Sequence, residues 1–206
     1  MLTPKRKGAD YHHGDVKRAA VLAGRNLIEV GGQPALGIRR VAEKIGVTAP
    51  AIYRHFRSLE DLLGEISQTV RNELGVVMMV RQNNVIKHRD QKKYELAKFE
   101  AIGDAYIDFA DHHPLLFQVA FINHDNQKID EFGEVSWLIL TESIDRFISL
   151  GMTPKSKRES APLIAWSAVH GLATLVANRA IEPSDLPFFR RSVMNGVQDA
   201  LFGKIL

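Results

Sequence analysis

A group of residues around position 50 combines small size, hydroxyl groups and positive charge, properties that suit contact with DNA. Hydroxyls, a phenol and cations bind phosphate oxygens, and small residues let a helix approach the edges of the bases. The free N–H groups of a helix amino terminus bind phosphate as well. We therefore predict a DNA-binding site at Thr48, Ala49, Pro50, Tyr53, Arg54 and His55, with Arg39 and Arg40 on a neighbouring basic face.

Two short helices that meet at Gly46 would hold these residues in place. Ile38 and Ile45 lie two helical turns apart, and the apolar residues between them complete one stripe for packing. Gly46 can adopt a left-handed conformation that ends the first helix, and Thr48 is a suitable N-cap for the second. Pro50 fits the first turn of that second helix. The pattern predicts a helix-turn-helix, although a solvated helix pair in an ordinary helical protein would share it.

The charge distribution favours DNA binding over that alternative. Residues 1–57 hold eleven Lys and Arg against four Asp and Glu, a net charge of +7, whereas residues 58–206 hold sixteen against twenty, a net charge of −4. A basic amino-terminal segment on an acidic remainder is typical of a DNA-binding head joined to a body with another role. We expect Lys5, Arg6 and Lys7 to form an arm along phosphates or in a minor groove, with a solubilising terminus as the alternative.

About fifty residues of this basic segment and its continuation resemble the TetR-type bacterial transcriptional regulators. The resemblance rests on an opening helix near residues 16–30, the string IRRVAEKIGV, the hallmark Tyr-x-His-Phe at residues 53–56, and the run SLEDLL that starts at Ser58. Gly37 stands where the family usually has Thr or Ser, and Leu59 stands where Lys is frequent. The resemblance implies a transcription factor with a DNA-binding head and a ligand-binding, dimerising body.

Beyond residue 57 the sequence shows helix after helix, without strand signals. Ser58, with Asp61 three residues on, resembles a capping box that begins the first of these helices. Proline and glycine mark breaks at residues 113–114, 151–154 and 182–183. The pattern predicts helices over residues 58–81, 91–112, 129–150, 157–180 and 184–202, and a short one after Pro114.

The carboxy-terminal part contains a second informative string, from Trp166 to Gly171, which is similar to the Trp-His-Gly pattern of one TetR-regulator effector-domain subfamily. Trp166 and His170 lie one helical turn apart, so the indole and imidazole can line one wall of a cavity. A tightly packed core with a hydrogen-bonded histidine is the alternative. The resemblance implies a pocket here, and the ligand-binding candidates are Phe99, Tyr106, Phe109, Phe117, Phe121, Trp137, Trp166 and His170.

The sequence lacks the residues expected for a disulfide, a metal site or an enzyme active site. The chain has no cysteine, which excludes disulfides, thiolate metal sites and a cysteine nucleophile. His112 and His113 point about 100° apart on a helix, so they do not easily share a metal ion with the nearby His124 and Asp125. The common nucleotide-binding and catalytic motifs do not appear. We predict no metal, no cofactor and no enzyme activity.

The sequence also predicts a cytoplasmic protein that does not associate with membranes. No apolar run approaches the ~18 residues of a spanning helix. The amino terminus has no hydrophobic secretory core.

We therefore predict an all-α protein of two domains: an arm with a three-helix helix-turn-helix domain over residues 1–57, and a helical bundle for ligand binding and dimerisation over residues 58–206. Its expected partners are double-stranded DNA with a palindromic operator, a small-molecule effector, and a second copy of the chain. The predicted function is transcriptional regulation by a repressor that a small molecule releases from its operator.

The last two predicted helices carry the apolar residues expected to form a homodimer: Leu163, Val169, Leu172, Leu175, Val176, Val193, Val197 and Leu201. The alternative function is that of a helical protein whose partner-binding or enzymatic body lacks sequence-specific DNA binding. Retention on heparin with a steep salt dependence would favour the regulator.

Overall fold

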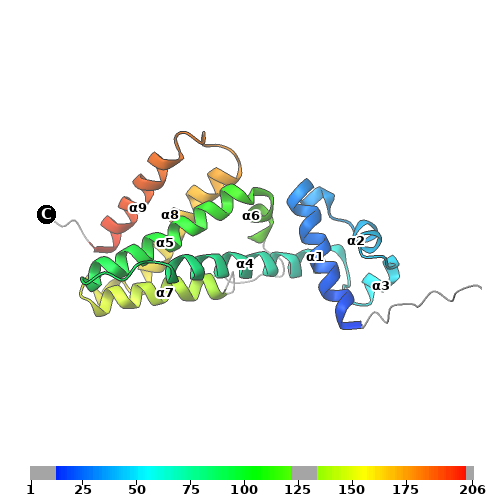
Figure 1. The fold of residues 1–206 in the computed structure, drawn as a ribbon, viewed down its shortest axis with the longest axis horizontal. Coiled ribbons are helices and arrows are strands. Elements are labelled where there is room, and N and C mark those ends of the chain that lie inside the picture. The colour runs from blue at the N-terminus through cyan, green and yellow to red at the C-terminus, as the bar shows by residue number, and fades with distance from the viewer. Residues whose placement is uncertain (1–12, 122–133, 203–206) are drawn as a thin grey trace, which may run out of the picture. The chain divides into compact units, whose positions relative to one another are not determined.

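The computed structural model describes residues 13–121 and 134–202, and every regular element within these residues is helical (Figure 1). This confirms the all-α fold class. The helices are α1 (His13–Gly31), α2 (Ile38–Lys44), α3 (Ala49–Tyr53), α4 (Leu59–Asn83), α5 (Gln91–His112), α6 (Pro114–Ala120), α7 (Glu134–Ser149), α8 (Ser160–Ala177) and α9 (Leu186–Phe202). Two short 3₁₀ helices, η1 (Gln33–Ala35) and η3 (Lys155–Lys157), precede α2 and α8.

The chain forms two compact units, which divide after Ile66, and α4 contributes to both. The boundary expected from the sequence lies earlier, at residue 57. The first turns of α4 group with the amino-terminal unit because their side chains pack there: Leu62 and Ile66 are fully buried, and Ile66 lies directly against Gly24 of α1.

The first unit builds its core from α1, α2, α3 and the start of α4. The side chains that fill it are apolar and fully or almost fully buried. They are Ala20, Ile28, Val41, Ala42, Ile52, Phe56, Leu62 and Ile66. A core of this kind holds the short helices α2 and α3, which are too short to be stable alone.

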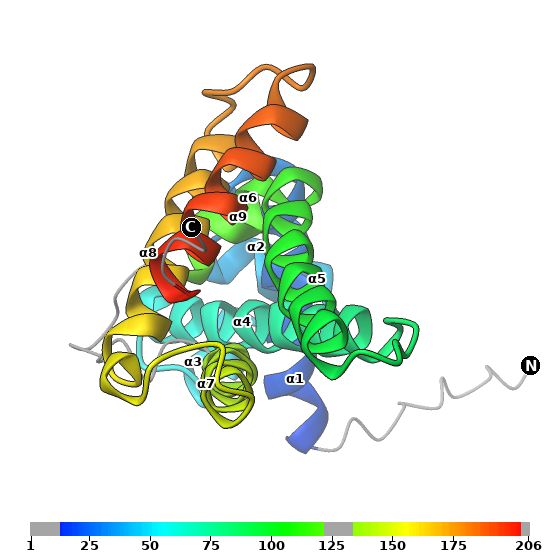
Figure 2. The same cartoon turned by 90° about the vertical axis from the view of Figure 1, so that its left-hand side faces the viewer.

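The second unit is a helical bundle in which α5 packs against α8, and α8 packs against α9. Figure 2 shows α9 beside α8. Helix α7 packs against α5 and α8, and α6 packs against the same two helices. The largest fully buried apolar side chains of the bundle are Leu74, Ile107, Leu116, Ile144, Phe147 and Leu201.

Helices α8 and α9 begin later than the sequence pattern predicted, and proline explains the difference. We expected α8 to begin at residue 157, but it begins at Ser160. A start at residue 157 would place Pro162 in the helix interior, where its ring clashes with a preceding carbonyl. The observed start keeps Pro162 in the first turn. Helix α9 begins at Leu186, which places Pro187 in its first turn as well.

Helix α8 is apolar over its whole length. By length and composition alone it could cross a membrane, with a mean hydropathy of 1.4 over Ser160–Ala177, which is more than the sequence inspection had suggested. Its packing against α5, α6, α7 and α9 accounts for the apolar side chains on its inner side. Only 39% of the segment is buried inside the chain, so apolar side chains remain on its outer side as well.

The apolar residues proposed for dimerisation divide between the core and the surface. Five of the eight lie buried inside the chain's own bundle, which corrects their assignment to an outer face: Val169, Leu172, Val176, Val197 and Leu201. Leu163 and Leu175 are 44% and 48% exposed. Ile164, which the sequence inspection passed over, is 41% exposed. The outward apolar face of α8 is therefore Leu163, Ile164 and Leu175.

Candidate nucleic-acid interface and ligand cavity

Helices α2 and α3 form the predicted helix-turn-helix, with Gly46 at the turn. Gly46 has φ +72°, the left-handed conformation that ends α2. Thr48 is the N-cap of α3 in an extended conformation, but its hydroxyl makes no capping hydrogen bond. Pro50 lies in the first turn of α3, and Ile52 of the same helix is buried. The hydroxyl of Thr48 is thus left to contact an outside partner.

The predicted DNA-binding side chains of the described part of the chain all reach the surface of the first unit. Tyr53 is 55% exposed. Thr48, Pro50, Arg54, Arg39 and Arg40 are exposed, and Ala49 and His55 are partly exposed. Arg40 also donates a hydrogen bond of 3.2 Å to the carbonyl of Ala35. Lys5, Arg6 and Lys7 lie outside the described residues.

The start of α4 carries the capping arrangement that the sequence predicted, with one change. The N–H of Asp61 donates to Ser58 Oγ at 3.1 Å. The carboxylate of Asp61 accepts a hydrogen bond of 2.9 Å from the N–H of Arg57, the residue before the cap and not the cap itself. The two bonds fix the path of the chain between α3 and α4.

Lys17 of α1 braces the same unit, a role that the sequence inspection missed. Its ammonium lies 2.7 Å from Glu65 Oε1 and 6.0 Å from the centre of the Phe56 ring. The ion pair is half-exposed and contributes less than about 1 kcal/mol, so its effect is to orient α1 against α4.

A cavity opens inside the second unit between α4, α5, α7, α8 and α9. Its volume is about 50 Å³. The wall is almost wholly apolar, and its only charged side chain among the described residues is Arg71. The lining residues are Arg71, Leu74, Met78, Phe99, Ile102, Gly103, Tyr106, Phe121, Ser136, Trp137, Leu140, Ala165, Trp166, Val169 and Met194.

Five of the eight aromatic candidates line this cavity: Phe99, Tyr106, Phe121, Trp137 and Trp166. The other three stand behind the wall. Phe109 is buried against His113, with ring centres 5.1 Å apart. Phe117 is buried against Tyr106 at 5.6 Å, and His170 contacts the same Tyr106.

Tyr106, Trp166 and His170 form a connected cluster at one end of the wall. The Tyr106 hydroxyl and His170 Nδ1 share a hydrogen bond of 2.8 Å. The Trp166 indole stacks on the imidazole with ring centres 4.9 Å apart and an angle of 21° between planes. Burial raises the pKa of Tyr106, against a smaller opposing effect of a hydrogen bond from Trp166, and burial lowers the pKa of His170. Both groups are therefore neutral near pH 7.

Arg71 is the one charged wall residue among the described residues, and sequence reasoning overlooked it. It is 2% exposed, and its guanidinium donates to the carbonyl of Ala120 and to Gln68 Oε1, each at 2.7 Å. Burial lowers the pKa of this guanidinium. A usable signal existed, since Arg71 falls among the apolar positions of α4 that face inward, with Leu74 three residues later.

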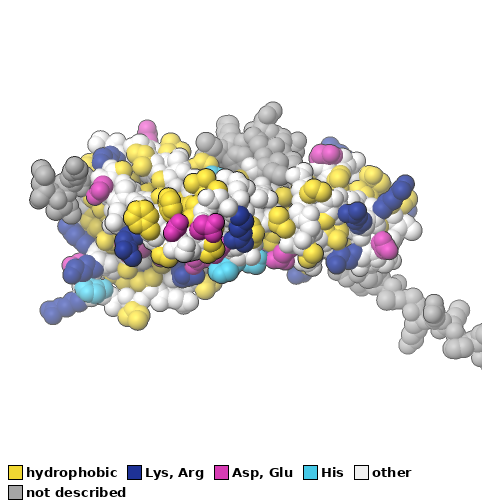
Figure 3. Space-filling model, turned by 90° about the horizontal axis from the view of Figure 1, so that it is seen from above, with side chains coloured by type: hydrophobic (Ala, Val, Ile, Leu, Met, Phe, Trp, Pro, Cys, Tyr) yellow, Lys and Arg dark blue, Asp and Glu magenta, His cyan; other side chains and the backbone are white. Residues whose placement is uncertain are grey.

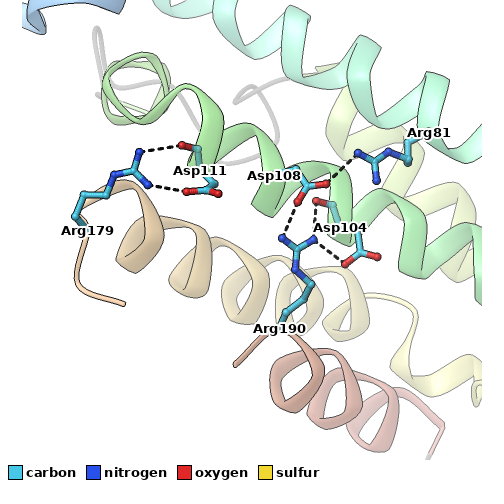
Figure 4. Close-up of polar contacts among 6 residues, drawn as sticks. All are labelled: Arg81, Asp104, Asp108, Asp111, Arg179 and Arg190. Carbon is cyan, nitrogen blue, oxygen red and sulfur yellow. Dashed lines mark hydrogen bonds and ion pairs between the residues drawn. The ribbon is translucent and has the colours of Figure 1, made fainter. Parts of the chain in front are cut away.

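Ion pairs along α5 tie the neighbouring helices together (Figure 4). Arg190 of α9 contacts Asp104 at 3.0 Å and Asp108 at 2.6 Å. Arg81 of α4 contacts the second oxygen of Asp108 at 2.9 Å. Beyond the end of α8, Arg179 contacts Asp111 at 2.6 Å. The carboxylates at residues 104, 108 and 111 thus hold three other segments of the bundle.

Two family profiles match the chain in the order in which its units occur. The profile described as bacterial regulatory proteins of the tetR family matches residues 21–66. The profile described as the tetracyclin repressor-like C-terminal domain matches residues 99–194. The chain belongs to the TetR family of transcriptional regulators. It is a DNA-binding regulator, and the family's members are not enzymes.

Solved structures share the fold of this TetR-family chain over nearly its whole length. A protein of unknown function from Rhodococcus sp. RHA1 is 21% identical, with a TM-score of 0.76 and coverage of 95% of this chain and 100% of that one. A TetR-family regulator from Pectobacterium atrosepticum is 13% identical, with a TM-score of 0.69 and coverage of 96% and 99%. RolR, solved with resorcinol, is 11% identical, with a TM-score of 0.62 and coverage of 94% and 96%. No curated protein matches the chain.

Members of the family bind DNA operators and small-molecule effectors and form dimers, and repression is typical of them. These properties agree with the function predicted from the sequence.

Proposed function

We propose that this TetR-family regulator is a cytoplasmic homodimeric repressor that binds a palindromic operator through α2 and α3 and leaves it when a small apolar molecule occupies the cavity. The observation that carries the proposal is the exposed face of α3 and its N-cap. There a hydroxyl without a capping bond, a phenol and a cation are all exposed, at Thr48, Tyr53 and Arg54.

The DNA contacts divide by chemistry. Thr48, Ala49 and Pro50 form the amino-terminal turn of the recognition helix, where small side chains allow close approach to base edges. Tyr53 and His55 follow that turn and contact phosphates, as do Arg54, Arg39 and Arg40. The arm residues Lys5, Arg6 and Lys7 add phosphate contacts from outside the described part of the chain.

The dimer forms through α8 and α9. Figure 3 shows one face of the molecule, on which yellow hydrophobic side chains lie among charged ones over the carboxy-terminal unit. Leu163, Ile164 and Leu175 give α8 an outward apolar face, and apolar surface of this kind can serve as a protein–protein contact. The exposed Phe188 and Phe189 extend apolar surface onto α9.

Dimerisation can be tested by charge insertion. Leu175→Glu should convert the dimer to a monomer in light scattering after size exclusion. Leu138→Glu is the matched control, because Leu138 is a 55% exposed leucine on α7, and that variant should remain dimeric. If Leu175→Glu stayed dimeric, the interface would lie elsewhere.

The effector is small and mainly apolar, because the cavity wall is apolar and the cavity volume is only about 50 Å³. RolR, which shares the fold, was solved with resorcinol, a molecule of one aromatic ring. We propose an effector of one aromatic ring that stacks on Trp166, within the Trp-His-Gly-type effector domain that the sequence suggested. The cavity must widen to admit it, since a cavity that binds benzene has a volume of about 150 Å³.

Release follows from the geometry of a two-fold dimer on DNA. Its recognition helices must lie about 34–36 Å apart to enter successive major grooves. An effector that binds better to a state with another separation draws the population away from the DNA-competent one. Helix α4, which contributes to both units, is the connection through which the cavity and the head are coupled.

Selection of genomic DNA fragments by the purified protein tests the proposal. Enriched fragments should share an inverted repeat, and fluorescence anisotropy should show affinity that falls steeply with salt. Fragments without a shared sequence would contradict sequence-specific binding. Effector binding has a built-in reporter, since both tryptophans of the chain, Trp137 and Trp166, line the cavity. A panel of single-ring aromatics should change their fluorescence and lower operator affinity together.

A further inference from the structure

A second hollow lies beside the cavity, on the outside of the bundle between α5 and α9. It is an open groove of about 500 Å³. Its lining residues are Glu100, Asp104, Pro183, Leu186, Pro187, Arg190, Arg191, Met194 and Asn195. Of the described residues, Met194 alone lines both this groove and the inner cavity. Met194 therefore lies between the cavity and the groove.

Met194 closes the gap because α5 leaves room for it. The residue facing it is Gly103, and a Cβ built on Gly103 would lie only 2.9 Å from Met194 Sδ and 3.0 Å from its Cε. Glycine at this position lets the thioether lie against the α5 backbone, and Met194 is only 7% exposed as a result. Methionine has three rotatable bonds and no branch, so it can swing aside at small cost.

Polar clamps hold α9 to α5 on both sides of this methionine. One turn before it, Arg190 contacts Asp104 at 3.0 Å and Asp108 at 2.6 Å (Figure 4). One turn after it, Gln198 Nε2 donates to Glu100 Oε1 at 2.8 Å. Arg190, Met194 and Gln198 are spaced four residues apart, so all three side chains lie on one face of α9.

We propose that the groove between α5 and α9 is the passage by which small apolar molecules reach the cavity, with Met194 as its movable partition and Arg190 as the clamp that limits its opening. This inference rests on the proposed function, in which the cavity takes the effector. The partition offers an apolar surface to an apolar molecule, and the charged clamp stays at the rim, where it need not enter the cavity. Opening breaks partly exposed polar contacts, which are weak in water, and leaves the buried core of the bundle intact.

The absence of cysteine from the chain makes the passage measurable. Ala165→Cys places one thiol on the cavity wall, because Ala165 lines the cavity and is 3% exposed. The matched control is Ala173→Cys on the same helix, since Ala173 is fully buried and does not line the cavity. The rate of reaction with methyl methanethiosulfonate, a small neutral reagent, is then measured by mass spectrometry on the full-length protein.

Met194→Ala and Arg190→Gln should each raise the rate at Cys-substituted position 165 by about tenfold, the factor that corresponds to about 1.4 kcal/mol of easier opening. Arg179→Gln is the control for loss of an ion pair to α5, because its partner Asp111 does not line the groove, and it should leave the rate unchanged. The rate at Cys-substituted position 173 should not change in any variant.

Two outcomes would overturn the proposal. An unchanged rate at position 165 in both Met194→Ala and Arg190→Gln would mean that the cavity is reached by another route. An equal rise at positions 165 and 173 would mean that the variants loosen the whole bundle and open no particular passage. If Arg190→Gln does not fold, Arg190→Lys replaces it in the assay. That variant keeps the positive charge but cannot bind both carboxylates as the guanidinium does. Because this assay needs neither DNA nor effector, its failure is distinct from failure of the aromatic panel, which tests the proposed function.

Discussion

Truncation of the indole in Trp166→Ala distinguishes a cavity wall from an ordinary core. Replacing a fully buried tryptophan by alanine costs about 3–5 kcal/mol of unfolding free energy. Trp166 is only partly buried and already borders an empty space, so fewer contacts are lost. The contacts that are lost include the stack on His170, with ring centres 4.9 Å apart, and the hydrogen bond to Tyr106. We therefore expect a loss of about 1.5–3 kcal/mol, which leaves the protein folded at 25 °C.

Urea unfolding gives the stability of the Trp166→Ala variant, and anisotropy on the selected operator gives its DNA affinity. Operator affinity without effector should stay within about twofold of the parent, a difference of only about 0.4 kcal/mol. The response to single-ring aromatics should be lost, with Trp137 remaining as the fluorescent reporter. Phe147→Leu is the control for core damage, because Phe147 is fully buried and lies outside the cavity wall. The reasoning fails if Trp166→Ala loses stability and operator affinity in parallel while still responding to aromatics.

Five further variants probe the DNA-binding head and the Tyr106, Trp166 and His170 cluster. Tyr53→Phe and His55→Ala should each weaken binding to all DNA sequences by about 1 kcal/mol, and a changed sequence preference in the selection assay would refute phosphate contact. Deletion of Met1–Lys7 should flatten the slope of log K against log salt by up to about 0.9 per phosphate contact, and an unchanged slope would make the arm a mere tail. Ser58→Ala removes the acceptor of the 3.1 Å capping bond and should lower unfolding free energy by about 1 kcal/mol in urea titrations, whereas no loss would show that the cap is dispensable. Burial lowers the pKa of His170, so the stability that the neutral imidazole contributes is fully present above about pH 6.5 and is lost as the pH falls through the lower pKa of the folded state. His170→Gln should therefore reduce the fall in Tm at acid pH. Parallel curves of Tm against pH for the parent and the variant would contradict this prediction.

The DNA-binding head was predictable because its signals are local. Gly46 ends α2, Pro50 fits the first turn of α3, and Ser58 with Asp61 begins α4, each by a rule that spans four residues or fewer. The one deviation, the bond from Arg57 to Asp61, depends on how the chain bends into α4, which no local rule specifies.

The sequence predicted that a cavity lined by aromatic residues exists, but not which of those residues line it. Aromatic residues at helical spacing indicated the right helices, but the rotation of each helix decides whether a ring faces the cavity, and rotation depends on packing from five helices at once. Phe117 stands behind Tyr106 for this reason. Helix α8 was misread in the same way, since a helix that is apolar all round does not reveal which face turns inward. Leu172 and Val176 turned inward, and Ile164 turned outward.

The groups that no sequence rule identified are those that join distant segments. Asp108 is bound by Arg81 of α4 through one oxygen and by Arg190 of α9 through the other, across 27 and 82 positions of sequence. If α9 moves and Arg190 separates from Asp108, Asp108 keeps only its ion pair with Arg81. This change would alter the electrostatic environment of α4. Because α4 contributes to both units, this shared carboxylate gives a physical reason why opening of the passage and the state of the DNA-binding head should be energetically linked. A double-mutant cycle on Arg81 and Arg190, with operator affinity as the readout, would measure that coupling, and additivity of the two single variants would show that the carboxylate transmits none.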